Sequence, residues 1–512
     1  MTQPASDSGA HADGFAPASS PRSDDGGALT AAAPPPLPAA QPSLLAAARP
    51  HRNHFLVLYG WFASAYYAQG VFQAYSGSFE QPLLESCGVG LEAVGFAQAI
   101  GQIPWIVKII FALPSDAWDC GGLGYRRPYA LGGLVLGASF LAVLAAFATC
   151  GGGGGGALTL PGYVAVAVVR NLGVCVSDVA TDGLAVDCDR SGESGQINAV
   201  MTAGRMVGLV VASSVAGAVA DALGYSSMIL VLSALVLAVA WLPLLLREER
   251  VRGGGERTAF SWAAFARFRE PTVLLFLASA CASNAGLAIA AFPMSAWQRG
   301  TFGFSLTDVG LGATVASVGL LVGSAATGPL FDRVSKRGAL LAAGAASSLS
   351  IFALLAVGSR EGVFAARFFA GCAEGSLWIV QSGLTMRLAD KRAGASFFAL
   401  AIMAMNFAIM AGNAAAGSLA QRVGLDACFV VGGVVSLSQL LPLPWLALID
   451  VEEADGSVAV LHKAPLAGAA GGLHAAQGTA FVTLREDVES DEPAPPPGEE
   501  NPQAPPEVDV KS

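Results

Sequence analysis

Residues 271–294 have the sequence PTVLLFLASACASNAGLAIAAFPM, an apolar run without a charged side chain. An α-helix rises 1.5 Å per residue, so about 20 apolar residues cross the hydrocarbon core of a bilayer. Hydrophobic residues occupy 54% of the 512 positions and charged residues 13%, whereas about 25% of residues in a soluble domain are charged. The chain is therefore predicted to be an all-α membrane protein rather than a soluble domain.

Further apolar stretches of about 18 to 25 residues recur along the chain, each the length of a spanning helix. They predict a polytopic protein with about twelve transmembrane helices. The expected spans are 55–77, 91–113, 129–149, 160–186, 196–220, 226–246, 271–294, 305–330, 339–357, 362–386, 396–420 and 427–449.

The two ends of the chain have a different composition from the spans. Residues 1–52 are rich in Ala, Pro, Ser, Asp and Gly, and they are expected to form a disordered cytosolic tail. Residues 451–512 hold much of the acid behind the formal net charge of -10, and a disordered acidic tail is expected there. Neither a signal peptide nor a transit peptide is recognised.

Basic residues in the loops predict the orientation, because they favour the cytoplasmic side. With the N-terminus inside, the outer loops contain only Arg299, Arg360 and Arg422. The inner loops contain Arg126, Arg127, Arg190, Arg247, Arg250, Arg252, Arg257, Arg267, Arg269, Arg333, Lys336, Arg337, Arg387, Lys391 and Arg392. Both termini are therefore predicted to be cytoplasmic.

Several features indicate an internal duplication. The longest inner connection, the cytoplasmic loop 247–270, divides the membrane region into residues 53–246 and 271–450. The loops after spans two and eight each place an acid, Asp116 or Asp332, before basic residues. Spans four and ten each carry an arginine and then an acid about two turns on. We predict two pseudo-symmetric six-helix bundles, from which alternating-access carriers are built.

Small residues in the spans predict close helix packing. Glycines four residues apart let two helix backbones approach each other in a membrane. Such pairs occur at Gly204/Gly208, Gly319/Gly323 and Gly371/Gly375.

Three motifs resemble signature positions of the major facilitator superfamily. Asp332 to Arg337 have the pattern D-R-x-x-[KR]-[KR], a looser version covers Asp116 to Arg127, and Arg170 lies in span four. The resemblance extends over the whole membrane region. It implies the fold of that superfamily, secondary transport by alternating access, and a cavity lined by spans one, four, seven and ten.

Two branches of the superfamily share shorter stretches with this chain. PWIVKIIFALPSD, GYRRPY and VSDVATDGLAVD resemble both the muropeptide-permease and acetyl-CoA transporter group and the folate and biopterin transporters. Residues 383–424 favour the first branch, and the SD and GYRRPY details favour the second. A facilitative uniporter or exchanger of folate-, pterin- or acyl-CoA-like solutes is therefore an alternative to a coupled carrier.

The resemblance also implies an inner gate made by two loops. Ala117 stands where the family usually has an arginine, so the first loop departs from the family pattern. The gating residues expected from the two loops are Asp116, Arg126, Arg127, Asp332, Arg333, Lys336 and Arg337.

Ionisable residues inside spans are the main candidates for chemistry, because an unpaired charge there costs at least about 2.5 to 3.5 kcal/mol. They are Lys108, Arg170, Asp178, Asp182, Arg205, Arg367 and Glu374. Asp178 and Arg205 lie at similar depth, so they are expected to pair. Asp178 and Asp182 share a helix face. Because all five histidines lie in the tails, Asp178 and Glu374 are the candidate proton carriers. A structural charge cluster is the alternative.

The candidate substrate-binding residues suggest the kind of solute. Four intramembrane cations against three acids favour an anionic or carboxylate-bearing solute, unless all these charges pair internally. Polar and aromatic residues on the lining spans would suit a solute with both a ring and hydrogen-bonding groups. They are Tyr66, Gln69, Gln73, Asn284, Trp378 and Gln381.

Other classes of protein have little support. Gly151 to Gly156 lack the lysine of a phosphate-binding loop, and no nucleophile and base pair is recognised in the spans. The eight cysteines are scattered singly, which indicates neither a metal site nor a disulfide framework. The expected protein is not an enzyme and needs no cofactor. Its expected partners are a small solute, the bilayer and, as a candidate, protons. No nucleic acid is expected, and the chain should be a monomer. A channel or a membrane scaffold is the remaining alternative.

Overall fold

A computed structural model of the chain describes residues 52–111, 114, 126–148, 159–188, 194–245, 268–331, 333–388 and 394–446. Within these ranges the chain forms helices and turns, with no strand. The described residues all belong to one compact unit. The predicted tails, most of the central loop, Asp116 and Asp332 lie outside them. The all-α fold class is confirmed.

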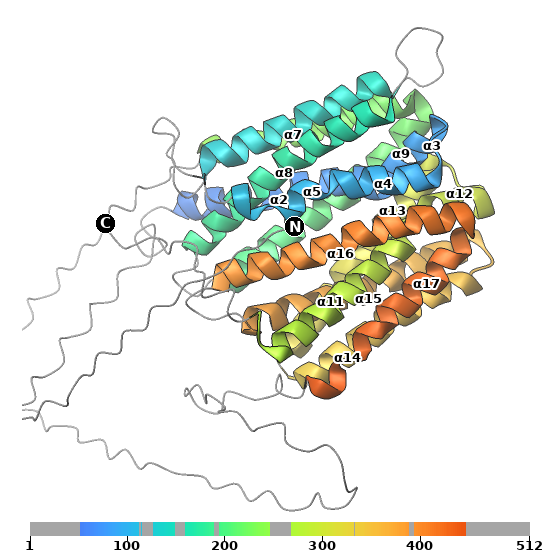
Figure 1. Ribbon diagram of the computed structural model, residues 1–512. Helices are drawn as coiled ribbons and strands as arrows, with labels where there is room; N and C mark the ends of the chain where they lie inside the picture. Colours follow the sequence, from blue (N-terminus) through green and yellow to red (C-terminus); the bar gives the residue numbers. More distant parts are fainter. Residues whose placement is uncertain are drawn as a thin grey trace, which may run out of the picture. The chain divides into compact units, whose positions relative to one another are not determined.

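The first six predicted spans correspond to the helices before the central loop (Figure 1). Predicted spans five and six together make up α9, which has a break in helical geometry at Gly224. The elements are α2 (Arg52–Ala74), a π-helical turn η1 (Tyr75–Phe79), α3 (Glu80–Ser86), α4 (Leu91–Gly101), α5 (Ile103–Ile106), α7 (Arg127–Phe147), α8 (Leu160–Cys188), α9 (Ser194–Ala240) and a 3-10 turn η3 (Leu242–Leu245).

The last six predicted spans correspond to the helices after that loop. The elements are α11 (Pro271–Ala291), α12 (Met294–Phe302), α13 (Leu306–Phe331), α14 (Lys336–Ala353), the 3-10 turn η4 (Leu354–Ala356), α15 (Arg360–Leu388), α16 (Gly394–Arg422), α17 (Leu425–Leu437) and the 3-10 turns η5 (Ser438–Leu440) and η6 (Leu443–Trp445).

The helix inventory agrees with the predicted number of spans. Nine helices in the described part of the chain are long and apolar enough to cross a membrane. One of them, Ala199–Leu245, holds two predicted spans, because Gly224 has a φ of 81° and reverses the chain there. These nine therefore hold ten predicted spans. The other two are α2 with its continuation and α4 with α5.

The first two spans differ from simple helices. Span one was expected to end at residue 77, but η1 and α3 continue it to Ser86. Span two is interrupted after Gly101, and α5 restarts at Ile103 with Pro104, which lacks a backbone N–H. Both irregularities lie beside the charged residues described below.

Pairs of small residues bring the helices together. In the first half α2 packs on α9 and α7 on α8, and in the second half α13 packs on α15 and α11 on α16. A Cβ added at Gly371 would lie 2.1 Å from the carbonyl oxygen of Ala316, so α15 and α13 touch at their backbones. Gly204, Gly208, Gly319, Gly323 and Gly375 make equally close approaches. The predicted close packing at these glycines is confirmed.

Two helix pairs make the most extensive contacts between the first six spans and the last six in the described part of the chain. α9 packs on α13, and α4 packs on α16, which Figure 1 shows side by side. Gly310 of α13 lies against the carbonyl oxygen of Ser213, and Gly95 of α4 lies against that of Asn413. The boundaries of the two six-helix bundles, 53–246 and 271–450, stay a prediction.

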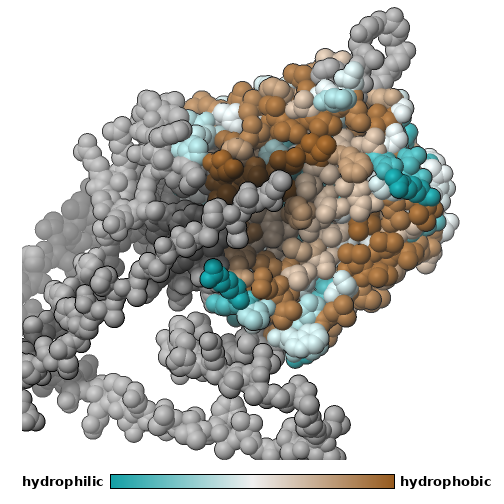
Figure 2. Space-filling model, in the orientation of Figure 1, coloured by the Kyte–Doolittle hydropathy of each residue, from teal (hydrophilic) through white to brown (hydrophobic). Residues whose placement is uncertain are grey.

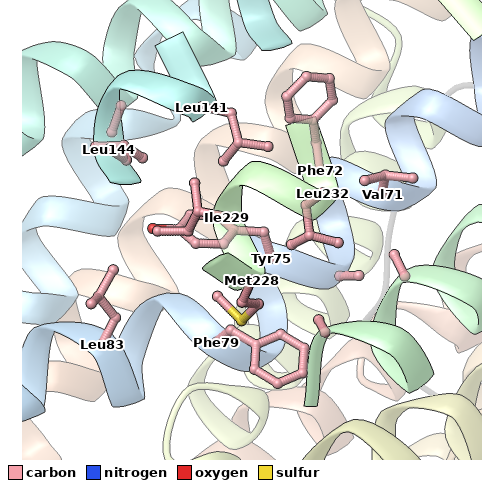
Figure 3. Close-up of a cluster of buried hydrophobic side chains, with 14 of the residues drawn as sticks. Val71, Phe72, Tyr75, Phe79, Leu83, Leu141, Leu144, Met228, Ile229 and Leu232 are labelled. Carbon is pink, nitrogen blue, oxygen red and sulfur yellow. The ribbon is translucent and has the colours of Figure 1, made fainter. Parts of the chain in front are cut away.

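The outer surface and the core of the helices have the expected polarity. Figure 2 shows apolar residues over most of the coloured surface, with hydrophilic patches at its margins. Large apolar side chains such as Leu349, Phe369 and Leu441 are exposed, as lipid-facing residues should be. Inside the first half, Phe72, Tyr75 and other buried side chains pack between α7 and α9 (Figure 3).

One cysteine differs from expectation. Cys87, directly after α3, is disulfide-bonded. Cys175, Cys281, Cys372 and Cys428 are free, so its partner is none of these. Single, evenly scattered cysteines hold no spacing signal from which this bond could be predicted.

Candidate functional site

A cluster of charged and polar side chains joins α2, α8 and the turn after α5. Lys108 Nζ lies 3.3 Å from Asp178 Oδ2 and 3.8 Å from Asp182 Oδ2. Gln69 donates from Nε2 to Asp178 Oδ1 at 2.7 Å, and the Tyr66 hydroxyl donates to Asp182 Oδ1 at 2.6 Å. We call these five residues the aspartate cluster.

The two acids of the aspartate cluster differ in accessibility. The side chain of Asp178 is 7% exposed, that of Lys108 is 9% exposed, and that of Asp182 is 37% exposed. Both carboxylate oxygens of Asp178 are engaged, one with Lys108 and one with Gln69. Asp182 is therefore the acid of this cluster that another molecule can reach.

A second cluster brings α9 of the first half against α15 of the second half. The guanidinium carbon of Arg205 lies 5.6 Å from the centre of the Trp378 ring, a cation–π contact. Glu374 has electrostatic interactions with Arg367 and Arg205. Arg205, Arg367, Glu374 and Trp378 form what we call the arginine cluster.

The direction of Glu374 follows from its neighbours on α15. Arg367, Glu374 and Trp378 are seven and four residues apart and so share one helix face. Trp378 meets Arg205 of α9 on that face, and Glu374 also has an electrostatic interaction with Arg205. Glu374 is exposed, and its carboxylate makes no hydrogen bond or close ion pair with any described residue. It therefore faces the space between the two halves.

The expected pair of Asp178 and Arg205 does not form. Asp178 pairs with Lys108 instead, and no ion pair joins it to Arg205 in the described ranges. Depth along a helix places two residues at one level, but it does not tell which faces turn toward each other. The broken helix at Gln102 brings Lys108 to α8, and helix periodicity alone does not predict such a break.

Arg170 lies in a closed network rather than on an accessible surface. It is 1% exposed, and its Nη2 lies 3.8 Å from Glu80 Oε2. Its guanidinium carbon lies 5.1 Å from the centre of the Tyr75 ring, and the Tyr163 hydroxyl donates to Glu80. This geometry supports a structural role for Arg170.

Glu80 is the residue of this region that sequence reasoning missed. The predicted span ended before it, so its acid was counted outside the membrane. The π-helical turn continues the helix and buries Glu80, which is 2% exposed, against Arg170. The sequence did hold a signal for its burial, because Glu80 lies within one helical turn of the predicted end of span one.

Two residues expected to line the cavity bind each other. Asn284 Nδ2 donates to Gln381 Oε1 at 3.3 Å, and Gln381 Nε2 donates to the Ser283 hydroxyl at 2.6 Å. Gln381 is 3% exposed. These bonds join α11 to α15 and leave Gln381 little surface for a solute. Gln73, by contrast, is exposed on the face of α2 that carries Gln69.

The first inner loop region holds its basic residues against helix ends. Arg127 donates from Nε to the carbonyl oxygen of Pro243 at 2.9 Å and from Nη2 to that of Leu244 at 2.5 Å. Arg126 is buried, and its guanidinium lies against Gly183 of α8. Asp116 lies outside the described residues, so its predicted gating contacts stay a prediction.

In the second inner loop, basic residues surround Phe331, the last residue of α13. Lys336 Nζ lies 4.4 Å from the centre of the Phe331 ring and donates to its carbonyl oxygen, and Arg387 stacks on the same ring at 5.5 Å. Arg333 is exposed, and Arg337 is half-buried. Asp332 lies outside the described residues.

The two halves are bonded to each other on the predicted outer side. Arg422 of α16 lies 2.7 Å from Glu92 of α4. Asp221 of α9 accepts hydrogen bonds from the backbone N–H groups of Leu306 and Thr307, at 3.1 and 2.7 Å, where α13 begins. These bonds close the outer end of the contact between the halves.

Two family models match the chain, one mainly in each predicted half. The BT1 family model matches residues 69–271, and the Major Facilitator Superfamily model matches residues 283–484.

Solved structures share the fold. A crystal structure of the nucleoside transporter NupG aligns with a TM-score of 0.59 and 12% identity, covering 78% of this chain and all of that one. A single-residue variant of the same transporter aligns with a TM-score of 0.61, 12% identity and 76% coverage of this chain, again over its full length.

Fold, spans and family matches together define the class: this is a multi-pass membrane transporter of the major facilitator type. The predicted resemblance is confirmed. Within that class, the first half resembles the BT1 family in particular. The resemblance to the muropeptide-permease branch stays a prediction.

Proposed function

We propose that this protein is a secondary active transporter that moves a small organic solute by alternating access, coupled to protons. The observation that supports this most strongly is the position of two accessible carboxylates, Asp182 and Glu374. Asp182 lies on α8 of the first half and Glu374 on α15 of the second half, and Glu374 faces the space between the halves. A solute held there would contact both halves, which a rocking carrier requires.

The contacts on the predicted outer side support the alternating-access part of the proposal. Glu92 with Arg422, and Asp221 with the start of α13, join the halves at that end. A carrier closed outside must break these bonds to admit solute from outside. We propose that they form the outer gate, and that the two inner loops form the inner gate.

The contacts favour Asp182 and Glu374 over Asp178 as the groups that exchange a proton. Asp178 has both oxygens bonded, so a proton there would displace Lys108 or Gln69. Asp182 accepts from Tyr66 and has a longer contact, 3.8 Å, with Lys108, but its side chain is 37% exposed. Glu374 has no hydrogen-bond partner among the described residues. Arrival of solute at Arg205 or Arg367 would weaken the attraction of these cations for Glu374 and let it take up a proton.

A proteoliposome assay tests the proposal. Purified protein should give saturable uptake and counterflow with at least one solute from a panel of pterins, acyl-CoA esters, short peptides, nucleosides and sugars. A proton gradient should drive accumulation of that solute above its external concentration. Linear, unsaturable flux would indicate a channel, and equilibration without accumulation would indicate a uniporter or exchanger.

Matched variants assign the coupling group. Asp182→Asn and Glu374→Gln should abolish proton-driven accumulation, and at least one should keep solute exchange, which needs no net proton movement. Glu361→Gln, which changes an exposed acid at the start of α15, is the control and should transport like the parent. If both interior variants still accumulate solute, these acids are structural and the coupling assignment is wrong.

A further inference from the structure

The formal charges inside the membrane region balance once Glu80 is included. The cations are Lys108, Arg170, Arg205 and Arg367, and the acids are Glu80, Asp178, Asp182 and Glu374, four of each. Arg170 and Glu80 pair with each other in their own closed network. The expected excess of positive charge, which favoured an anionic solute, therefore does not remain.

The balanced charges are separated in space. The aspartate cluster holds one lysine and two aspartates, a formal charge of -1. The arginine cluster holds two arginines and one glutamate, a formal charge of +1. Helix α2 links them, because its Tyr66 donates to Asp182 and its Gly70 packs against the backbone of Arg205 on α9. One site thus has a negative end and a positive end.

Each end has an open charged group. Asp182 is the accessible acid of the aspartate cluster. Arg205 makes no hydrogen bond or ion pair with any described residue, and its Nε is buried without a partner. The guanidinium carbon of Arg205 lies 5.6 Å from the centre of the Trp378 ring, and the paired N–H groups of a guanidinium can bind both oxygens of a carboxylate. Glu374 is shared between Arg205 and Arg367, and a charge in the membrane without a full counter-charge is unfavourable.

We propose that the transported solute is a zwitterion, bound with its cationic group at Asp182 and its anionic group at Arg205. This inference rests on the proposed function and names the substrate class of the same site. A purely anionic solute would leave the aspartate cluster, where two aspartates share Lys108, with an uncompensated negative charge. A purely cationic solute would leave Arg205 without a hydrogen-bonded counter-charge.

Equilibrium binding to the purified full chain in detergent tests the inference with matched probes. Tyrosine, tyramine, 3-(4-hydroxyphenyl)propionate and 4-ethylphenol share a phenol ring and differ only in their amino and carboxylate groups. Tryptophan, tryptamine, indole-3-propionate and 3-ethylindole form a second set with a larger ring. The zwitterion of at least one set should bind about tenfold or more tightly than both single-charge relatives, since a charged hydrogen bond contributes about that factor.

Two charge variants locate the groups. Asp182→Asn should remove the advantage that the amino group gives, and Arg205→Gln should remove the advantage that the carboxylate gives. Glu361→Gln should leave both unchanged, and melting temperatures near the parent value would show that the variants are folded. The inference is overturned if a single-charge or neutral relative binds as tightly as the zwitterion. It is equally overturned if neither zwitterion binds at millimolar concentration.

Failure of this inference is distinguishable from failure of the proposed function. The binding assay needs no transport, so a zwitterion preference without uptake would contradict the transport proposal alone. Saturable, proton-driven uptake of an anion or a cation that binds without a zwitterion preference would contradict the substrate class alone.

Discussion

Replacing Glu80 by glutamine tests whether the buried pair with Arg170 stabilises the first half. The carboxylate lies 3.8 Å from Arg170 Nη2, with both side chains at most 3% exposed. At that distance and an effective dielectric constant of about 20, the attraction is about 4 kcal/mol. Arg170 Nε and Nη1 have no other partner in the described region, so the variant leaves a buried cation without its counter-charge. We expect a loss of about 3 to 5 kcal/mol of stability.

The same helix offers a matched control. Glu85 of α3 also lies 3.8 Å from an arginine, Arg299, but these two side chains are 26% and 37% exposed. At the dielectric constant of water the attraction is about 1 kcal/mol, so Glu85→Gln should cost at most about 1 kcal/mol. Distance and substitution are equal, and each glutamate also accepts one side-chain hydrogen bond, from Tyr163 or from Gln81, so burial is the main difference.

Thermal denaturation of the purified protein in detergent, under identical heating rates, is the measurement. Glu80→Gln should melt several degrees below the parent, and Glu85→Gln should melt close to it. Adding Arg170→Gln to Glu80→Gln should recover part of the loss, because no unpaired charge then remains. Equal shifts for the two single variants would refute the argument that burial decides the strength of this pair.

Three further predictions concern the gate, the helix packing and the topology. Glu92→Gln should break the outer bond to Arg422. An impermeant thiol reagent added from outside should then modify a cysteine introduced at Gln73 faster than in the parent. An unchanged rate would contradict the outer gate. Gly371→Ala should lower the free energy of unfolding by about 1 to 3 kcal/mol, since its Cβ would overlap the α13 backbone. Gly132→Ala, in open space, should leave the free energy of unfolding unchanged or raise it by up to about 1 kcal/mol. Similar melting temperatures for the two variants would exclude backbone contact at Gly371. Epitope tags on both termini should resist external protease in sealed cells, and cleavage of one tag alone would contradict an even number of spans.

Much of the fold could be predicted because it depends on local properties. The length of each apolar run decides that a segment spans the bilayer, and the twelve predicted spans all have counterparts. Glycine spacing predicted close packing at Gly319/Gly323 and Gly371/Gly375, because two glycines one turn apart remove side chains from one helix face. The structure shows that these two pairs meet each other, on α13 and α15. The extension of span one was missed, since its π-helical turn depends on contacts made by Tyr75 and Glu80 with distant helices.

The sequence by itself determined the ionisable residues of the membrane region other than Glu80, because hydrophobicity and helix length are properties of consecutive residues. Only the tertiary structure decided how those residues are partnered. Arg170 is buried with Glu80, Asp178 is bonded to Lys108, and Arg205 is left open against Trp378. An ion pair is set by the rotation and tilt of two helices, and these follow from packing across the whole bundle. The accessibility of Asp182 and Glu374 depends on that packing and on no local pattern.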